Sequence, residues 1–268
     1  MSGVTSQPPR RIRVVICWDM LSGYIASCWR VLAARPEIEL SVIAVEAIKG
    51  ANIAFSREIT AGLDVTLVTR DELNAGKTAE LAAAKKPDVV VVCGWGLPGM
   101  RMIPEHPDLA HAKFMMTMDT PIAQAWKPMV RQRMGRGARR AYFAMIERVA
   151  VAGLRAWQLA RVLGFGEHQI VRGCYAIDWP RFEPIMNDRR TAHRAWPRRF
   201  LFMARYVPDK AIDVMVEAYS AYREQVRDPW PLVCCGQGEE GARLRGVEGI
   251  EDVGFVQTAD QPARQRDS

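Results

Sequence analysis

Short apolar runs alternate with helix-length amphipathic segments along most of the chain, and this alternation constrains the fold more than any other feature. The runs are apolar at nearly every position, so each strand that they form must be buried on both faces. Such burial is found in parallel sheets with helices on either side. The sequence therefore predicts an α/β fold with doubly wound parallel sheets. The predicted strands cover 12–17, 39–45, 64–69, 88–93, 113–118, 148–153, 199–204, 231–236 and 250–256.

One segment, 179–198, interrupts the alternation. It contains three prolines, many charges and no helical or strand period. We therefore predict one complete doubly wound, acceptor-side domain over 1–182, a linker over 183–198 and a partial second Rossmann-like domain over 199–257. The tail, 258–268, has no apolar anchor and is expected to be disordered.

Composition and cysteine usage bound the environment of the protein. The chain carries a formal net charge of +7, which is compatible with an anionic small ligand, an anionic membrane surface or nucleic acid. Its six cysteines form no CxxC pair and no Cys/His cluster with zinc spacing, which favours reduced core cysteines in a cytosolic protein. No apolar run approaches the roughly 18 residues of a membrane span. We expect a cytoplasmic protein that meets a membrane, at its inner face, only through its surface.

Two cations stand where the predicted strand at 199–204 gives way to a predicted helix over 210–226. Free backbone N–H groups at a helix N-terminus and the helix dipole favour an anion. Arg205 can donate two bonds to phosphate oxygens, and Lys210 adds a point charge in the first turn of the helix. The alternative is that both side chains are solvated or pair with neighbouring aspartates. Spacing alone leaves the two interpretations open.

The stretch FLFMARYVPDKAIDVMVEAY…PLVCCGQGEEGARL…IEDVGFV resembles the second domain of family 4 glycosyltransferases, which have the two-domain GT-B fold. In that family an apolar strand leads into Gly-Arg, then Glu-Lys-Gly and an amphipathic helix, and a second strand leads into Gly-x-Gly. The resemblance covers most of 12–257 and is most specific over 199–256. It implies that Arg205 and Lys210 hold the diphosphate of the donor.

The same resemblance assigns roles to two later turns. Gly236 and Gly238 match the Gly-x-Gly turn that follows the second strand. Phe255 and Val256 match the strand whose end lies near the nucleotide base. These residues are therefore expected to contribute to nucleotide binding.

Some positions depart from the family pattern. Ala204 replaces the glycine before the arginine and Ala211 the glycine after the lysine, which requires only that the backbone there tolerates a methyl group. The family's pair of glutamates, E-x7-E, which contacts the donor sugar and the ribose, has no counterpart in the sequence. We interpret the chain as C-terminally truncated or as a degenerate copy.

By resemblance, the chain is a glycosyltransferase that moves a sugar from a nucleotide-diphosphate donor to a sugar or lipid-linked acceptor. The donor would bind in the cleft between the domains, and the anomeric configuration would be retained. The two cations would take the place of a metal, and no other cofactor is expected. The competing hypothesis is a non-catalytic remnant that binds a nucleotide or a partner chain without transfer.

Two further candidate residues lie in the first domain. Asp119 ends the strand at 113–118, where it can contact an acceptor hydroxyl as a catalytic residue or cap the next helix. Gly23 follows Ser22 in the loop after the first strand, where a glycine lets the backbone approach a ligand. In the resembling family this loop faces the donor phosphates. A plain capping turn is the alternative.

GWGLPG at 94–99 formally matches the dinucleotide fingerprint G-x-G-x-x-G, with Asp119 roughly 20 residues further on. The fingerprint should open a helix, and Pro98, Pro104 and Pro107 argue against one. We therefore predict a loop that lines the ligand-binding edge of the sheet. A nicotinamide- or flavin-dependent oxidoreductase is kept as a third hypothesis.

A basic segment over 127–140 contains six Lys or Arg residues and no acid, interleaved with apolar side chains. Such a segment can lie on an anionic membrane or present a solvated face. No nucleic-acid recognition motif accompanies it, so a nucleic-acid partner is not expected. The histidines are too scattered to predict a metal site. The cations of the segment are Lys127, Arg131, Arg133, Arg136, Arg139 and Arg140.

Overall fold

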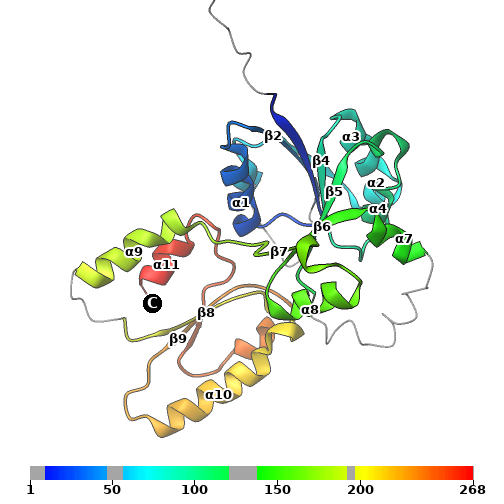
Figure 1. Ribbon diagram of the computed structural model, residues 1–268. Helices are drawn as coiled ribbons and strands as arrows, with labels where there is room; N and C mark the ends of the chain where they lie inside the picture. Colours follow the sequence, from blue (N-terminus) through cyan, green and yellow to red (C-terminus); the bar gives the residue numbers. More distant parts are fainter. Residues whose placement is uncertain (1–9, 47–56, 121–137, 192–196, 268) are drawn as a thin grey trace, which may run out of the picture. The chain divides into compact units, whose positions relative to one another are not determined.

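The computed structural model describes residues 10–46, 57–120, 138–191 and 197–267 (Figure 1). Its contacts divide the chain into two compact units. The first comprises Met1–Glu46 and Thr60–Ile177, and the second Ala47–Ile59 and Asp178–Ser268. Each unit has its own parallel sheet, with seven strands in the first and three in the second. The predicted α/β class, a doubly wound sheet plus a smaller Rossmann-like one, is confirmed.

The sheet of the first unit has the strand order β3-β2-β1-β4-β5-β6-β7, and every neighbouring pair is parallel. The chain winds from β1 toward one edge of the sheet, returns, and continues from β4 toward the other edge. Ligands of open α/β sheets bind where the winding reverses, at the carboxyl ends of the strands. The strands are β1 (Ile12–Trp18), β2 (Ile38–Val45), β3 (Val65–Val68), β4 (Val89–Cys93), β5 (Lys113–Met118), β6 (Ile146–Val151) and β7 (Ile170–Arg172).

Right-handed crossovers place the helices of the first unit on both faces of its sheet. The helices are α1 (Gly23–Ala33), α2 (Arg70–Asn74), α3 (Lys77–Ala84), α4 (Pro98–Met102), α7 (Ala138–Ala144) and α8 (Leu154–Val162), with short 3-10 helices η2 (Pro107–Leu109) and η3 (Glu167–Gln169). A further 3-10 helix, η1 (Arg57–Thr60), lies at the division between the two units. α1 follows the winding toward β2 and α3 the opposite winding, so they cover opposite faces (Figure 1). The largest cluster of buried apolar side chains joins the central strands to α2, α3, α4, α7 and α8.

A short helix forms within the glycine- and proline-rich segment, so the prediction that prolines exclude a helix there is wrong. Pro98 occupies the first turn of α4, where its missing N–H has no intrahelical partner to lose. Gly99 has a packing role. A Cβ at this position would lie 2.2 Å from the carbonyl oxygen of Leu73, so the glycine lets α4 pack closely against α2.

Two short elements of the first unit were not among the predicted ones. α2 begins with a capping box, in which the Thr69 hydroxyl accepts from the Glu72 N–H at 3.2 Å and the Glu72 carboxylate accepts from the Thr69 N–H at 2.7 Å. β7 has three residues, of which Val171 and Arg172 are exposed. A strand this short and this exposed lacks the apolar run on which the predictions depend.

The second unit is built on a sheet with the order β10-β9-β8, again parallel. All four residues of the central strand β9 are buried, so both faces of this small sheet are covered. One face packs against α10 and η5 through a second apolar cluster, in which Tyr206, Ile212 and Tyr219 are buried. The elements are α9 (Trp179–Thr191), β8 (Phe200–Met203), η4 (Pro208–Lys210), α10 (Ile212–Gln225), β9 (Leu232–Cys235), η5 (Glu239–Leu244), β10 (Ile250–Asp252) and α11 (Gln261–Arg266).

Two segments without a predicted period form helices in this unit. α9 overlaps the segment 183–198, which was interpreted as a linker, and α11 lies in the tail that was expected to be disordered. Pro184 sits inside α9, where it removes a single intrahelical bond. The Arg189 guanidinium donates to the Gln265 carbonyl at 2.7 Å and so ties the tail to α9. A contact between residues this far apart in sequence is not visible to a local pattern.

The residue before α10 has a strained backbone. Ala211 has a φ of 50° and a ψ of 52°, in the left-handed region. A residue with a Cβ loses roughly 1–2 kcal/mol in this region, whereas glycine enters it freely. From the sequence we expected the backbone to tolerate a methyl group at this position. The structure shows instead that Ala211 adopts a strained conformation, which lowers the stability of the fold.

Ala211→Gly is expected to raise the free energy of unfolding by about 1 kcal/mol, because it relieves this strain. The measurement is urea unfolding of the full chain. Ala218→Gly, at an exposed position inside α10, is the matched control and should lower the same free energy by about 1 kcal/mol. A loss of stability in both variants would contradict the left-handed conformation of residue 211.

Candidate functional site

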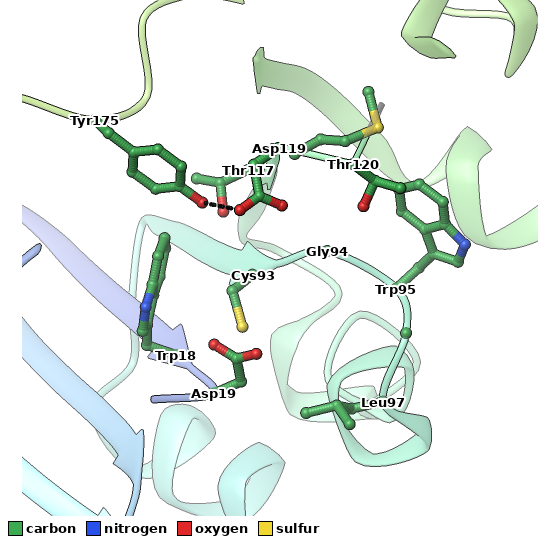
Figure 2. Close-up of a pocket in the computed structure, with 12 residues that line it drawn as sticks. Trp18, Asp19, Cys93, Gly94, Trp95, Leu97, Thr117, Asp119, Thr120 and Tyr175 are labelled. Atoms are coloured by element: carbon green, nitrogen blue, oxygen red, sulfur yellow. Dashed lines mark hydrogen bonds between the residues drawn. The ribbon is translucent and has the colours of Figure 1, made fainter. Parts of the chain in front are cut away.

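A cavity of about 460 Å³ opens at the carboxyl ends of β1, β4 and β5, where the winding of the first sheet reverses (Figure 2). This is the position that the topology of an open α/β sheet favours for a ligand. Its volume lies within the roughly 300–1,000 Å³ of small-molecule pockets. We call it the first-unit pocket. Its lining residues are Trp18, Asp19, Cys93, Gly94, Trp95, Gly96, Leu97, Thr117, Met118, Asp119, Thr120 and Tyr175.

The loop over 94–97 forms one wall of the first-unit pocket, as the sequence predicted for this segment. The Gly94 N–H donates to the Thr117 carbonyl at 3.0 Å, which continues the pairing of β4 with β5. The buried Tyr142 hydroxyl donates to the Gly94 carbonyl at 3.2 Å, and the Arg101 guanidinium donates to the Trp95 carbonyl at 3.3 Å. The loop is therefore held by α4, β5 and α7.

Aromatic rings form other parts of the wall. Trp18, at the end of β1, is buried and makes edge contacts with Trp29 at 6.1 Å and with Tyr175 at 6.3 Å between ring centroids. Tyr24 packs edge-on against Tyr175 at 5.7 Å. Trp95 contacts a ring of α7 in the same way. These contacts fix the rings, so the pocket has walls that are largely preformed.

Two carboxylates line the pocket from strands on either side of β4. The Tyr175 hydroxyl donates to Asp119 Oδ2 at 3.2 Å (Figure 2). Burial, reinforced by the charge of Asp119, raises the pKa of Tyr175, so this phenol stays protonated and remains a donor. Loss of hydration raises the pKa of the Asp19 carboxyl, while the Cys93 thiol that faces it acts in the opposite direction.

Cys93 is better described as a wall of the pocket than as the core residue that the sequence suggested. Its thiol points toward the Asp19 carboxylate (Figure 2). Burial raises the pKa of the Cys93 thiol well above its ordinary value, and the negative charge of Asp19 adds to this effect. A neutral thiol is a weak nucleophile, so the side chain is not arranged for covalent chemistry.

The structure places Asp119 in the first-unit pocket, where a ligand can reach it. The alternative role, a cap for the next helix, concerns 121–137, which lies outside the described residues. Gly23 begins α1 and is buried, and it is not among the lining residues. Beside it the Ser22 hydroxyl is buried without a hydrogen-bond partner among the described residues, although Ser22 occupies the N-cap position of α1.

Arg205 and Lys210 lie just beyond the carboxyl end of β8 in the second unit, and both are exposed. Within the described part of the chain, neither side chain forms a hydrogen bond or an ion pair. The alternative in which they pair with Asp209 and Asp213 is therefore not seen. Two unneutralised cations at the carboxyl edge of a parallel sheet are available to an anion.

The sequence indicated that Lys210 lies in the first turn of the helix, but in the structure it lies before α10. It ends the 3-10 helix η4, and the left-handed Ala211 separates it from the start of α10 at Ile212. The reason is that Pro208 begins a tight turn of its own, closed by the Ala211 N–H donating to the Pro208 carbonyl at 3.0 Å. Lys210 thus precedes the helix N-terminus instead of opposing its dipole from within.

Gly236 and Gly238 stand beside the exit of β8 because they pack against it. A Cβ on Gly236 would lie 1.9 Å from the Ala204 carbonyl oxygen, and one on Gly238 would lie 2.1 Å from the Tyr206 carbonyl oxygen. The buried Tyr206 hydroxyl donates to Asp252 Oδ1 at 2.8 Å, which fastens the exits of β8 and β10 together. The fold therefore requires glycine at both positions, because a Cβ at either one would clash with the backbone after β8.

Phe255 and Val256 do not lie in a strand. β10 ends at Asp252, so the predicted strand over 250–256 is too long. Gly254 has a φ of 72°, outside the strand region, and its N–H donates to Asp252 Oδ1 at 3.0 Å, which closes the turn. The Gly236 N–H also donates to the Gly254 carbonyl at 2.9 Å. The segment 254–256 therefore lies at the same sheet edge as the turn after β9.

The predictions about the basic segment, a metal site and a membrane span concern other parts of the chain. Most of the basic segment, 127–137, lies outside the described residues. Among the residues that the structure does describe, no group of three or more His, Cys, Asp or Glu side chains could hold a metal ion. None of the described helices is both long and apolar enough to cross a membrane.

Neither a protein-family model nor a curated protein sequence matches the chain. Solved structures do. The S. aureus MnaA–UDP complex is 12% identical with a TM-score of 0.59, and the match covers 93% of this chain and 70% of that one. UDP-GlcNAc 2-epimerase from Neisseria meningitidis bound to UDP-GlcNAc is 8% identical with a TM-score of 0.59, over 94% and 74%. A glycosyltransferase from Rickettsia africae is 13% identical with a TM-score of 0.57, over 95% and 71%.

These likenesses define the fold class. The chain has a GT-B-like fold of two Rossmann-like units, similar to that of nucleotide-sugar epimerases and glycosyltransferases. At such low sequence identity the likeness concerns the fold alone.

Proposed function

We propose that the chain is a glycosyltransferase that binds a nucleoside diphosphate sugar and transfers the sugar to a saccharide or lipid-linked acceptor. Within the glycosyltransferases, we propose family 4, because the sequence over 199–256 resembles the second domain of that family. The observation that carries it is the pair of exposed cations, Arg205 and Lys210, which have no ion-pair partner among the described residues and stand at the carboxyl edge of the second sheet. The similar structures with UDP and with UDP-GlcNAc support a nucleotide-sugar partner.

Each candidate residue has a physical role in this proposal. The Arg205 guanidinium donates two bonds to the diphosphate, and Lys210 supplies a second positive charge. As the bond between the anomeric carbon and the diphosphate oxygen breaks, these charges stabilise the negative charge that builds on the leaving group. No metal or other cofactor is required. Phe255 and Val256 are assigned to the nucleotide base, and Gly23 with the buried Ser22 hydroxyl to a phosphate.

The first-unit pocket is assigned to the acceptor. Asp119 is exposed there. Its carboxylate can accept the proton of the acceptor hydroxyl while the hydroxyl oxygen of the acceptor bonds to the anomeric carbon. Its bond from Tyr175 orients the carboxylate without neutralising it. Retention of anomeric configuration, which the resemblance implies, requires that the acceptor oxygen approach the anomeric carbon from the face that the diphosphate leaves.

A second candidate is a nucleotide-sugar epimerase, which the similarity to UDP-GlcNAc 2-epimerases favours. An epimerase needs no acceptor and leaves the sugar attached to the nucleotide. A third outcome, binding without turnover, corresponds to a non-catalytic remnant. The three differ in their products and can be separated by one experiment.

Incubation with isotopically labelled nucleotide sugars, analysed by mass spectrometry and NMR, tests the proposal. A transferase releases the nucleoside diphosphate and passes the label to an added saccharide, or slowly to water. An epimerase yields a nucleotide sugar of unchanged mass with an inverted ring carbon. Recovery of the donor unchanged, from protein that nevertheless binds it, would contradict the catalytic proposal and support the remnant.

A further inference from the structure

We infer that the first-unit pocket selects a saccharide or related polyol that carries a protonated amine. The inference rests on the proposed function, in which this pocket holds the acceptor, and it names the class of that acceptor. It follows from the charge, the unsatisfied polar group and the walls of the pocket.

The charge of the pocket is opposite to that of the chain. Two carboxylates, Asp19 and Asp119, line it, and no Lys, Arg or His is found among its described lining residues. The chain as a whole carries +7. Two negative charges within one cavity attract a cation and repel a phosphate or carboxylate. An anionic acceptor is therefore disfavoured at this position.

An unpartnered hydroxyl on a largely buried side chain gives a second, independent indication of a ligand. Thr117 is only 9% exposed, yet it lines the pocket, and its hydroxyl forms no hydrogen bond to another described residue. The hydroxyl is open to the pocket, so it can exchange a hydrogen bond with a polar group of a ligand there. Carboxylates only accept hydrogen bonds. The ligand must therefore bring donors, which ammonium and hydroxyl groups provide.

The walls suit a ring that carries both C–H faces and a positive charge. Trp18, Trp95 and Tyr175 contribute aromatic surface around the two carboxylates (Figure 2). Aromatic faces attract cations and cover the apolar faces of sugar rings. A metal ion is not favoured as the cation, because no three suitable ligand side chains converge anywhere in the described ranges. Loss of hydration raises the pKa of Asp19, the charge of Arg70 lowers it and the charge of Asp119 raises it slightly; an organic cation bound in the pocket would add to the lowering effect.

Saturation-transfer NMR on the full chain without nucleotide tests the inference at pH 6.5, where a sugar amine is protonated. The probes are glucosamine, N-acetylglucosamine and glucuronate, which share a ring and differ in charge. Glucosamine should bind at least about tenfold more tightly than N-acetylglucosamine, because a hydrogen bond between charged groups exceeds one between neutral groups by about 1–2 kcal/mol. Glucuronate should show no saturable binding.

Variants locate the effect. Asp119→Asn should weaken glucosamine binding about tenfold and close the gap to N-acetylglucosamine, and Asp19→Asn should act in the same direction. Glu39→Gln, which removes one exposed negative charge in the amino-terminal half of β2, is the matched control and should leave the affinity unchanged. Equal affinity for glucosamine and glucuronate, or no saturable binding of any probe, would overturn the inference. An amine preference that survives both Asp variants would do so too.

The outcomes separate this inference from the proposed function. No nucleotide is present, so the amine preference does not depend on Arg205 or Lys210. If the preference appears and UDP does not bind, the transferase proposal fails while the amine site stands. If UDP binds but glucosamine is not preferred over N-acetylglucosamine, the inference about the acceptor fails and the transferase proposal is unaffected.

Discussion

Gly236→Ala is expected to lower the free energy of unfolding of the second unit by at least about 3 kcal/mol, the upper end of the usual cost of overpacking. The added Cβ would lie 1.9 Å from the Ala204 carbonyl oxygen and 2.6 Å from the ring of Tyr206. Neither neighbour can move easily. The Ala204 N–H donates to the Cys235 carbonyl, and Tyr206 is 1% exposed and bonded to Asp252. The clash therefore separates strands instead of displacing one flexible side chain.

Hydrogen exchange measured by mass spectrometry localises the expected effect of this substitution. Peptides that contain β8 and β9 should lose protection in Gly236→Ala, while those from β1 and β4, in a separate core, should keep it. Gly254→Ala is the matched control, because a Cβ there meets no atom within 4 Å and only the positive φ is at stake. It should cost roughly 1–2 kcal/mol. Unchanged protection of β8 in Gly236→Ala would contradict the packing described for this edge.

This packing role shows where sequence reasoning reached its limit. Gly236 and Gly238 were assigned to nucleotide binding by resemblance, and the edge on which they lie is the expected one. The sequence could not show that both glycines are already required by the path of Tyr206. A glycine that makes room for the protein's own backbone and one that makes room for a ligand leave the same mark in the sequence.

The fold was largely predictable because its strands are apolar on nearly every position, which identifies buried parallel strands without further information. Short elements were not predictable, because the three residues of β7 carry no such run. The helix α4 was wrongly excluded, because Pro98 in a first turn costs little. Helix α11 depends on the bond from Arg189 to Gln265, which connects segments far apart in the chain.

The first-unit pocket was predictable only in part. Asp119 and the loop over 94–97 follow apolar strands directly, and strand ends converge at one edge of a parallel sheet. Tyr175 comes from an irregular segment after β7, so no local pattern connects it with Asp119. Trp18 and Trp95 are apolar residues near predicted strand ends. They line the same cavity because of the order of the strands in the sheet, which was not predicted from the sequence.

Arg205→Ala is expected to weaken the binding of nucleoside diphosphates on the order of 10- to 100-fold, because hydrogen bonds to charged groups contribute about 1.5–3 kcal/mol. The substitution should leave the stability of the second unit nearly unchanged, since Arg205 is exposed and forms no bond to the described part of the chain. Lys210→Ala should have a smaller effect, because an ammonium group makes a less directional contact with phosphate than a guanidinium does. Isothermal titration calorimetry with UDP, GDP and ADP measures these affinities.

Arg227→Ala is the matched control for this loss of charge. Arg227 is an exposed arginine of the same unit, in the connection that leads into β9 and therefore at the opposite, amino edge of the sheet. Its removal lowers the net charge by the same amount, so it reports any general electrostatic effect. Equal weakening by Arg205→Ala and Arg227→Ala would show that overall charge, and not a site after β8, attracts the nucleotide.

Calorimetric titration of the wild-type chain and of Arg205→Ala with UDP and with UMP tests the central claim most directly. The two nucleotides share base and ribose and differ by one phosphate, so their affinity difference reports the cations after β8. We predict that UDP binds the wild-type chain at least about tenfold more tightly than UMP and that this difference becomes markedly smaller in Arg205→Ala, where Lys210 alone remains. Equal affinities of UDP and UMP for the wild-type chain, or no heat from UDP at millimolar concentration, would contradict the assignment of a diphosphate site.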